Sequence, residues 1–233
     1  MPIGRVSPLK EEKMKKVCCM LLLGLTLVAW TQAYAYKDHD FQIWNTDAEE
    51  FKINKDSKIT LEEEFRWGKN AGEFFYHHYD AGYSYSLKKW LAVGGGYRHV
   101  YELKNRKFKA ENEPYLTATL SGEKKGFVFE SRSRMEYRQF RYQDDTWRYR
   151  NKFTLKLPWK FTELKIQPYL ADELFLGFGN SATELSQNRF YAGFGASLTK
   201  NFKTELYYLL VSTKNSGKWT DANVFGTKLK LSF

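Results

Sequence analysis

The sequence is poor in cysteine and, beyond its first 35 residues, has no continuous apolar run. Both cysteines, Cys18 and Cys19, lie in that leading segment, so the rest of the chain has no disulfide, thiolate nucleophile or cysteine metal site. The chain also has no phosphate-binding loop, dinucleotide-binding fingerprint or cluster of metal ligands. We therefore expect neither a metal nor a cofactor.

Residues 1–35 have the pattern of a leader with a cleaved signal peptide. Lys13, Lys15 and Lys16 form a basic start, residues 17–29 form an apolar stretch, and Ala-Tyr-Ala at 33–35 gives a cleavage pattern. A retained membrane anchor is the weaker alternative, because the apolar stretch is shorter than the roughly 20 residues that a spanning helix needs.

The charge balance is basic even without the leader. Removing it takes away five basic and two acidic residues, so the formal net charge falls from +10 to +7. A basic exported protein is suited to anionic lipid head groups or acidic polymers. Nucleic acid is not expected as a partner, because export separates the chain from it.

Beyond residue 35 the dominant pattern is period-two alternation, which predicts an all-β chain. In the segment 127–140, Phe129 and Met135 fall on one face, whereas Arg134 and Glu136 fall on the other. A soluble barrel would turn the apolar face inward. Here charged faces on adjacent strands can pair with one another if they point into a closed lumen, and the aromatic face then meets lipid. The pattern therefore predicts an up-and-down antiparallel transmembrane barrel in the bacterial outer membrane, in contact with its lipids.

Ten strands are predicted from residue 56 to the end of the chain, which makes 56–233 the barrel. Residues 36–55 form a weak candidate, since the segment 45–50 is polar on both faces. We expect 36–55 either to stay outside the wall or to hide a further strand pair, because single-chain bacterial barrels have even strand numbers. Twelve strands are therefore the alternative.

Links between the segments alternate in predicted length. Short links are expected near 87–89, 122–126, 158–162 and 200–201, and longer ones near 104–111, 177–187 and 214–221. Because membrane barrels have short periplasmic turns and longer outer loops, this predicts a periplasmic carboxyl end. The final Phe233 resembles the terminal residue by which the barrel assembly machinery recognises outer-membrane barrels.

Several short motifs together resemble a bacterial outer-membrane barrel family catalogued as a domain of unknown function, DUF2490. The similarity covers most of the chain after the leader. It rests on Ile43–Trp44, Glu64–Arg66, Ser133–Arg138, Arg148–Asn151, Asp172–Phe175 and Gln187–Phe190. The resemblance implies a barrel and its location, and it implies no activity.

The main candidate site is a charged stripe on two neighbouring segments. Its members are Glu130, Arg132, Arg134, Glu136, Arg138, Arg148, Arg150 and Lys152. One interpretation is an ion network that fills a narrow lumen, since barrels of about eight strands are nearly full of side chains. The other is a basic lining that selects small anionic solutes. The first is favoured, because alternating signs cancel much of the field.

A second candidate lies at the predicted outer rim. Asp172 and Glu173 are neighbouring carboxylates, Arg189 is expected to pair with Glu173, and His78 shares the lumen face. Such a set could serve acid-base chemistry, so a rim enzyme acting on lipid or peptide is the alternative to a narrow channel or plugged barrel. No serine lies in a nucleophile motif, which makes an enzyme the less favoured hypothesis. A secreted soluble β-protein is the third.

Overall fold

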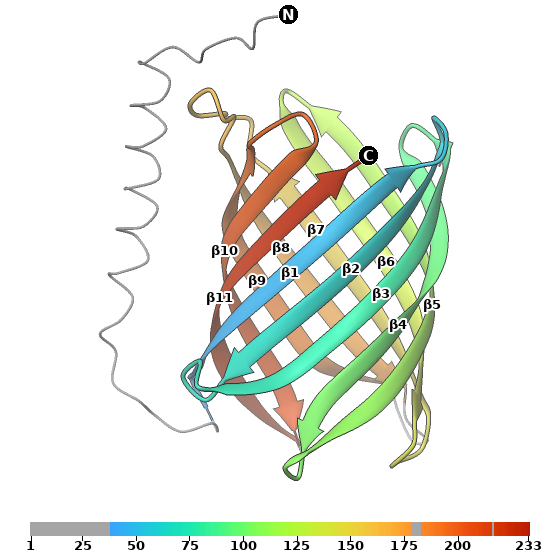
Figure 1. Cartoon of the computed structure of the whole chain (residues 1–233), viewed down its shortest axis with the longest axis vertical. Helices are drawn as coiled ribbons and strands as arrows, with labels where there is room; N and C mark the ends of the chain where they lie inside the picture. Colours follow the sequence, from blue (N-terminus) through green and yellow to red (C-terminus); the bar gives the residue numbers. More distant parts are fainter. Residues whose placement is uncertain (1–37, 179–182, 216) are drawn as a thin grey trace, which may run out of the picture. The chain divides into compact units, whose positions relative to one another are not determined.

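The computed structural model describes residues 38–233, apart from 179–182 and 216. The predicted leader and signal peptide lie outside the described residues. The described part is an all-β closed barrel (Figure 1). Within the described ranges, no helix is long and apolar enough to cross a membrane.

Eleven strands of 11 to 18 residues form the wall, each tilted to the barrel axis (Figure 1). They are β1 (Asp40–Lys52), β2 (Ser57–Gly68), β3 (Glu73–Lys88), β4 (Leu91–Lys104), β5 (Lys107–Lys124), β6 (Phe127–Phe140), β7 (Thr146–Lys156), β8 (Gln167–Phe178), β9 (Thr183–Ser197), β10 (Phe202–Asn215) and β11 (Lys218–Ser232). Consecutive strands pair antiparallel, as predicted for a meander.

The strand number corrects the prediction of ten, and the alternative of twelve is wrong too. The segment 36–55 contributes one strand, β1, which closes the barrel by pairing with β11. In a meander with an odd number of strands, the first and last strands run the same way, so this closing pair is parallel. The two strands lie side by side at the front of Figure 1.

β1 was underestimated because residues 45–50 are polar on both faces of the strand. Its inward side chains nevertheless find partners inside the barrel. Trp44 and Ala48 face inward and are buried, with 3% and 5% of their surfaces exposed. Glu50, also inward, accepts hydrogen bonds from the ammonium groups of Lys58 on β2 and Lys230 on β11, both at 2.8 Å. These ion pairs connect β1 to both of its neighbours.

The predicted alternation of loop lengths is confirmed only in part. The links expected to be short near 87–89, 122–126 and 200–201 are two to four residues long, and residues 179–182 of the link expected at 177–187 lie outside the described residues. The link expected to be long at 104–111 is a two-residue turn, in which Asn105 and Arg106 have φ of 52° and 60°. Conversely, residues 157–166 form a ten-residue link at the end of the barrel that also holds the carboxyl terminus. Loop length therefore does not indicate which end is periplasmic.

The β2–β3 turn is held by the first residue of β1. Lys69, Asn70 and Ala71 all have φ between 53° and 61°, a left-handed conformation that is uncommon for residues other than glycine. The buried Asp40 carboxylate accepts hydrogen bonds from the N–H groups of Lys69 and Asn70, each at 3.0 Å. Asp40 thus offsets the strain of a turn far away in sequence.

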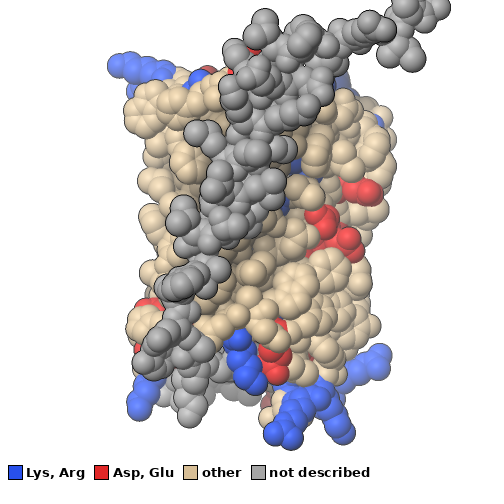
Figure 2. Space-filling view, turned by 60° about the vertical axis from the view of Figure 1, so that its left-hand side comes forward, with Lys and Arg blue, Asp and Glu red and all other residues tan. Residues whose placement is uncertain are grey.

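The alternation sorts side chains between a mostly apolar outer face and a polar lumen. Large side chains such as Leu116, Phe194 and Phe153 are exposed on the outside. Figure 2 shows Lys and Arg gathered at the two ends of the face it presents, and most of the wall between them is uncharged apart from a few acidic side chains.

Candidate functional site

Glu136 on β6 lies at the centre of the charged part of the lumen. Its buried carboxylate accepts hydrogen bonds from the guanidinium groups of Arg148 (2.5 Å) and Arg150 (2.9 Å), both on β7. Arg150 also donates to Glu173 on β8 at 2.8 Å. Arg148 donates to Glu113 on β5 at 2.6 Å. Two arginines therefore connect carboxylates on three strands.

The carboxylates that balance the positive charges of β6 and β7 lie largely on strands that sequence reasoning did not single out. Asp80 on β3 accepts a hydrogen bond from Arg98 on β4 at 2.9 Å. Glu111 on β5 forms a two-pronged ion pair with Arg138, whose Nη2 lies 2.8 Å from the carboxylate. A signal did exist, because Glu111 and Glu113 are spaced two apart and so share a face.

The structure places all eight residues of the predicted stripe on the inward faces of β6 and β7. Their environments differ. Glu130 is exposed and forms no ion pair with any residue in the described ranges. Arg134 lies 3.5 Å from Asp80, with its guanidinium 3.8 Å from the ring centre of Tyr115.

The four rim candidates do not meet at a rim. Glu173 and Arg189 lie inside the lumen, in the middle of β8 and β9, with 3.9 Å between their charged groups. Asp172 faces outward, where it accepts a hydrogen bond from Asn188 at 2.8 Å. His78 is buried on β3, 1% exposed. The error follows from the loop prediction, since β8 continues to residue 178.

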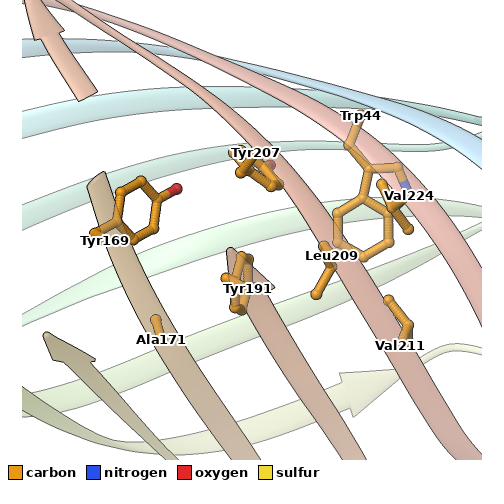
Figure 3. Packing of buried hydrophobic residues seen from close by; sticks show 8 residues of the cluster. All are labelled: Trp44, Tyr169, Ala171, Tyr191, Tyr207, Leu209, Val211 and Val224. Carbon is orange, nitrogen blue, oxygen red and sulfur yellow. The ribbon is translucent and has the colours of Figure 1, made fainter. Parts of the chain in front are cut away.

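The lumen also has an apolar side, formed by β8 to β11 and β1 (Figure 3). Tyr169, Tyr191 and Tyr207 lie on adjacent strands, and Leu209 and Val224 are fully buried beside them. The complete cluster is Trp44, Tyr169, Ala171, Tyr191, Tyr207, Leu209, Val211 and Val224. The interior is therefore packed on one side and charged on the other.

Arginines and aromatic rings alternate across the lumen in an arrangement that we call the waist stack. Its members, in order, are Tyr76, Arg66, Trp44, Arg189, Phe175 and Arg150. The Arg66 guanidinium lies 3.9 Å from the ring centre of Tyr76 and 3.7 Å from that of Trp44. The Arg189 guanidinium lies 5.0 Å from Trp44 and 4.6 Å from Phe175. Desolvated contacts of this kind contribute up to about 2 kcal/mol each.

Two cavities meet at this level of the lumen. One, of about 220 Å³, lies toward the end that holds the carboxyl terminus, and the other, of about 310 Å³, lies toward the opposite end. Arg66, Arg98, Arg150 and Arg189 line both cavities, which places them at the boundary. The first is lined by eight Lys or Arg and five Glu side chains, the second by eight and three. Both are therefore net positive.

Some carboxylates interrupt the apolar outer wall. Asp47 and Glu49 on β1 and Glu63 on β2 line an outward groove of about 540 Å³, together with Tyr79 and His99. Asp47 and Glu63 are directly opposite each other in the β1–β2 pair. The outer face of β1 to β4 is thus more polar than the rest of the wall.

One group of potential metal ligands lies at a barrel end. Asp38, His39 and Asp221 offer ligand atoms within 4.8 Å of one another. Two of the three are exposed, and exposed acidic groups commonly bind no ion. We assign no metal site to them.

A protein-family model described as "Protein of unknown function (DUF2490)" matches residues 41–222, from β1 into β11. The chain belongs to the DUF2490 family. The resemblance to the DUF2490 family is confirmed, and the outer-membrane location that it implies stays a prediction. The lumen, the waist stack and both cavities belong mostly to the part that DUF2490 covers. No curated protein matches the chain. The family description assigns no activity, so function has to be argued from the lumen.

Proposed function

We propose that this DUF2490 protein is an outer-membrane β-barrel whose lumen is closed at its middle by side chains. One observation carries the proposal: charged groups are buried inside, and large apolar groups are exposed outside. Glu136, Glu173 and Arg150 are at most 6% exposed, whereas Leu116 is 70% exposed. Water would penalise such an outer face, and hydrocarbon favours it.

The ends of the wall support placement in a bilayer. Trp90 and Trp159 are more than half exposed at the end with the carboxyl terminus, and Trp147 and Trp219 are exposed near the opposite end. Aromatic side chains form such bands at the two interfaces of membrane barrels. The closed hydrogen-bonded wall also leaves no strand edge facing lipid. Outer-membrane lipids are therefore the proposed neighbours of the apolar face.

The carboxyl end is the proposed contact for the barrel assembly machinery. Phe233 is 61% exposed, and its ring stacks on that of Phe51 with 5.1 Å between ring centres. The Phe233 N–H donates to the carbonyl of Glu50 at 2.8 Å, which ties the end of the chain to β1. The terminal ring is thus accessible in the folded barrel.

Closure of the lumen follows from the waist stack and the ion network around it. Contacts reach between strands that are not neighbours, such as Arg189 on β9 over Trp44 on β1 and Arg134 on β6 near Asp80 on β3. Side chains that meet across the interior stand between two adjoining cavities, and this crossing supports a lumen that is closed at its middle. A wide general porin is therefore not the proposed function.

Cell fractionation tests the location. The full chain is expressed in a Gram-negative host, and the outer membrane is separated from the inner membrane and the soluble periplasm. We expect the processed protein in the outer membrane, with a heat-dependent shift in electrophoretic mobility that reports a folded barrel. Recovery of the processed protein in the soluble periplasm would refute the membrane placement.

Conductance in planar bilayers tests closure. We expect the wild type to pass little current, and the double variant Trp44→Ala with Phe175→Ala to pass several-fold more, because it removes two rings of the waist stack. The matched control is Tyr208→Ala, which removes an exposed outer ring and leaves the lumen intact. A large wild-type conductance, or an unchanged current in the folded double variant, would contradict a closed lumen.

A further inference from the structure

Four inward side chains form a continuous row across strands β6 to β9. Arg132 lies opposite Lys152, Lys152 opposite Glu173, and Glu173 opposite Arg189. All four line the smaller cavity. The row therefore presents three cations and one carboxylate to this cavity, whose lining also includes Glu62, Glu64, Glu130 and Glu205.

The one carboxylate does not satisfy the three cations. Glu173 accepts its short hydrogen bonds from Arg150 at 2.8 Å and from the Tyr191 hydroxyl at 3.2 Å. Its distances to the guanidinium groups of Arg132 and Arg189 are 3.8 Å and 3.9 Å, beyond hydrogen-bonding range. The short hydrogen bonds of Glu173 are therefore made with Arg150 and Tyr191, which are not members of the row.

Arg189 is the most buried of these cations. It is 9% exposed, and its guanidinium forms no hydrogen bond with the described residues; its Nε is buried without a partner. The Lys152 ammonium lies 3.7 Å from the ring centre of Tyr191 and has no carboxylate within ion-pair distance in the described ranges. Burying a charge without a hydrogen-bonding partner is costly. An anion in the cavity would supply the missing acceptors.

We propose that Arg132, Lys152 and Arg189 form a binding site for a small oxyanion, a phosphate or a carboxylate. A guanidinium presents a planar fork that matches two oxygens of either group, and an ammonium adds a third donor. The cavity of about 220 Å³ has room for a small anion. It corresponds to roughly seven waters at about 30 Å³ each. The site deepens the proposed function, because it specifies what the basic lumen holds.

The competing interpretation is that the row only stabilises the barrel. The two interpretations differ in what neutralising Arg189 does to the affinity for an anion. Arg189→Gln removes the contacts of the guanidinium with Trp44, Phe175 and Glu173, so a loss of stability fits both interpretations. A fall in the affinity for an anion fits only the binding site.

The test is calorimetric titration of the refolded, full-length processed barrel in detergent micelles. Inorganic phosphate and acetate are titrated separately at constant ionic strength, with sodium chloride as the reference salt. We expect saturable binding of one or both oxyanions. Arg189→Gln and Lys152→Gln should each weaken binding at least about tenfold, as the loss of one charge-assisted hydrogen bond predicts.

Two further variants test whether the effect is specific to this site and whether it depends on the shape of the guanidinium. Lys104→Gln is the matched control: it removes one positive charge from the other cavity, where Lys104 pairs with Glu102 at 2.9 Å. It should leave binding within about twofold of wild type, as expected for a partly exposed pair. Arg189→Lys keeps the charge but not the fork and should recover part of the affinity.

The proposal is overturned if the folded wild type binds neither oxyanion more tightly than chloride. It is also overturned if folded Arg189→Gln and Lys152→Gln both bind as the wild type does. Because binding is measured in micelles, these outcomes do not depend on cellular location or conductance. Failure of the outer-membrane proposal would appear in fractionation instead, with the titration unaffected.

Discussion

Neutralising the buried Glu136 should destabilise the barrel far more than the same change in an exposed ion pair. Glu136 is fully buried and accepts hydrogen bonds from Arg148 and Arg150. In Glu136→Gln both guanidinium groups lose a buried counter-charge, a change that costs about 3 to 5 kcal/mol when a buried pair is broken. We expect the lower part of that range, because glutamine keeps one acceptor oxygen.

The matched control is Glu184→Gln, since Glu184 pairs with Lys214 and its side chain is 57% exposed. That change should cost less than about 1 kcal/mol. Both variants are unfolded by guanidinium chloride in detergent micelles, with tryptophan fluorescence as the probe, and the free energies of unfolding are compared with the wild type. A loss below about 1 kcal/mol for Glu136→Gln would refute the view that the network depends on burial.

Two other perturbations test packing and turn geometry. Gly226→Ala should cost about 1 to 3 kcal/mol, because an added Cβ would lie 2.1 Å from the Tyr207 ring. Gly122→Ala, where nothing lies within 4 Å, should change the free energy of unfolding little, so equal losses in both would contradict the packing argument. Asp40→Ala should cost about 1 to 3 kcal/mol, because it leaves the N–H groups of residues 69–70 without their acceptor. Hydrogen exchange at these two amides should accelerate, and unchanged protection there would rule out the proposed role of Asp40.

The sequence was informative where one face of a strand is apolar and the other charged. On β6, Phe129 and Met135 alternate with Arg134 and Glu136, so orientation follows directly from the period of two. The distribution of charges on β6 and β7 could therefore be predicted before any pairing was known. The partners of these charges could not be predicted. Asp80, which lies near Arg134, stands among tyrosines and glycines on a strand far away in the chain.

β1 was only a weak candidate in the sequence for a related physical reason. Its outward face carries Asn45, Asp47 and Glu49, so it lacks the apolar stripe that marks the other strands. What holds it in the wall is inward and non-local: Trp44 between two arginines, and Glu50 between two lysines. Such contacts appear only once the barrel closes. The same holds for the waist stack, whose members come from β1, β2, β3, β7, β8 and β9.

The parallel seam between β1 and β11 has a consequence for the path of the chain. With eleven strands, the chain enters the wall at one end of the barrel and leaves it at the other. In a barrel that spans a bilayer, the residues before β1 and those after β11 then face different compartments. A peptide displayed ahead of Asp40 and one appended after Ser232 would be accessible from opposite sides of the same membrane, an asymmetry that barrels with even strand numbers do not have.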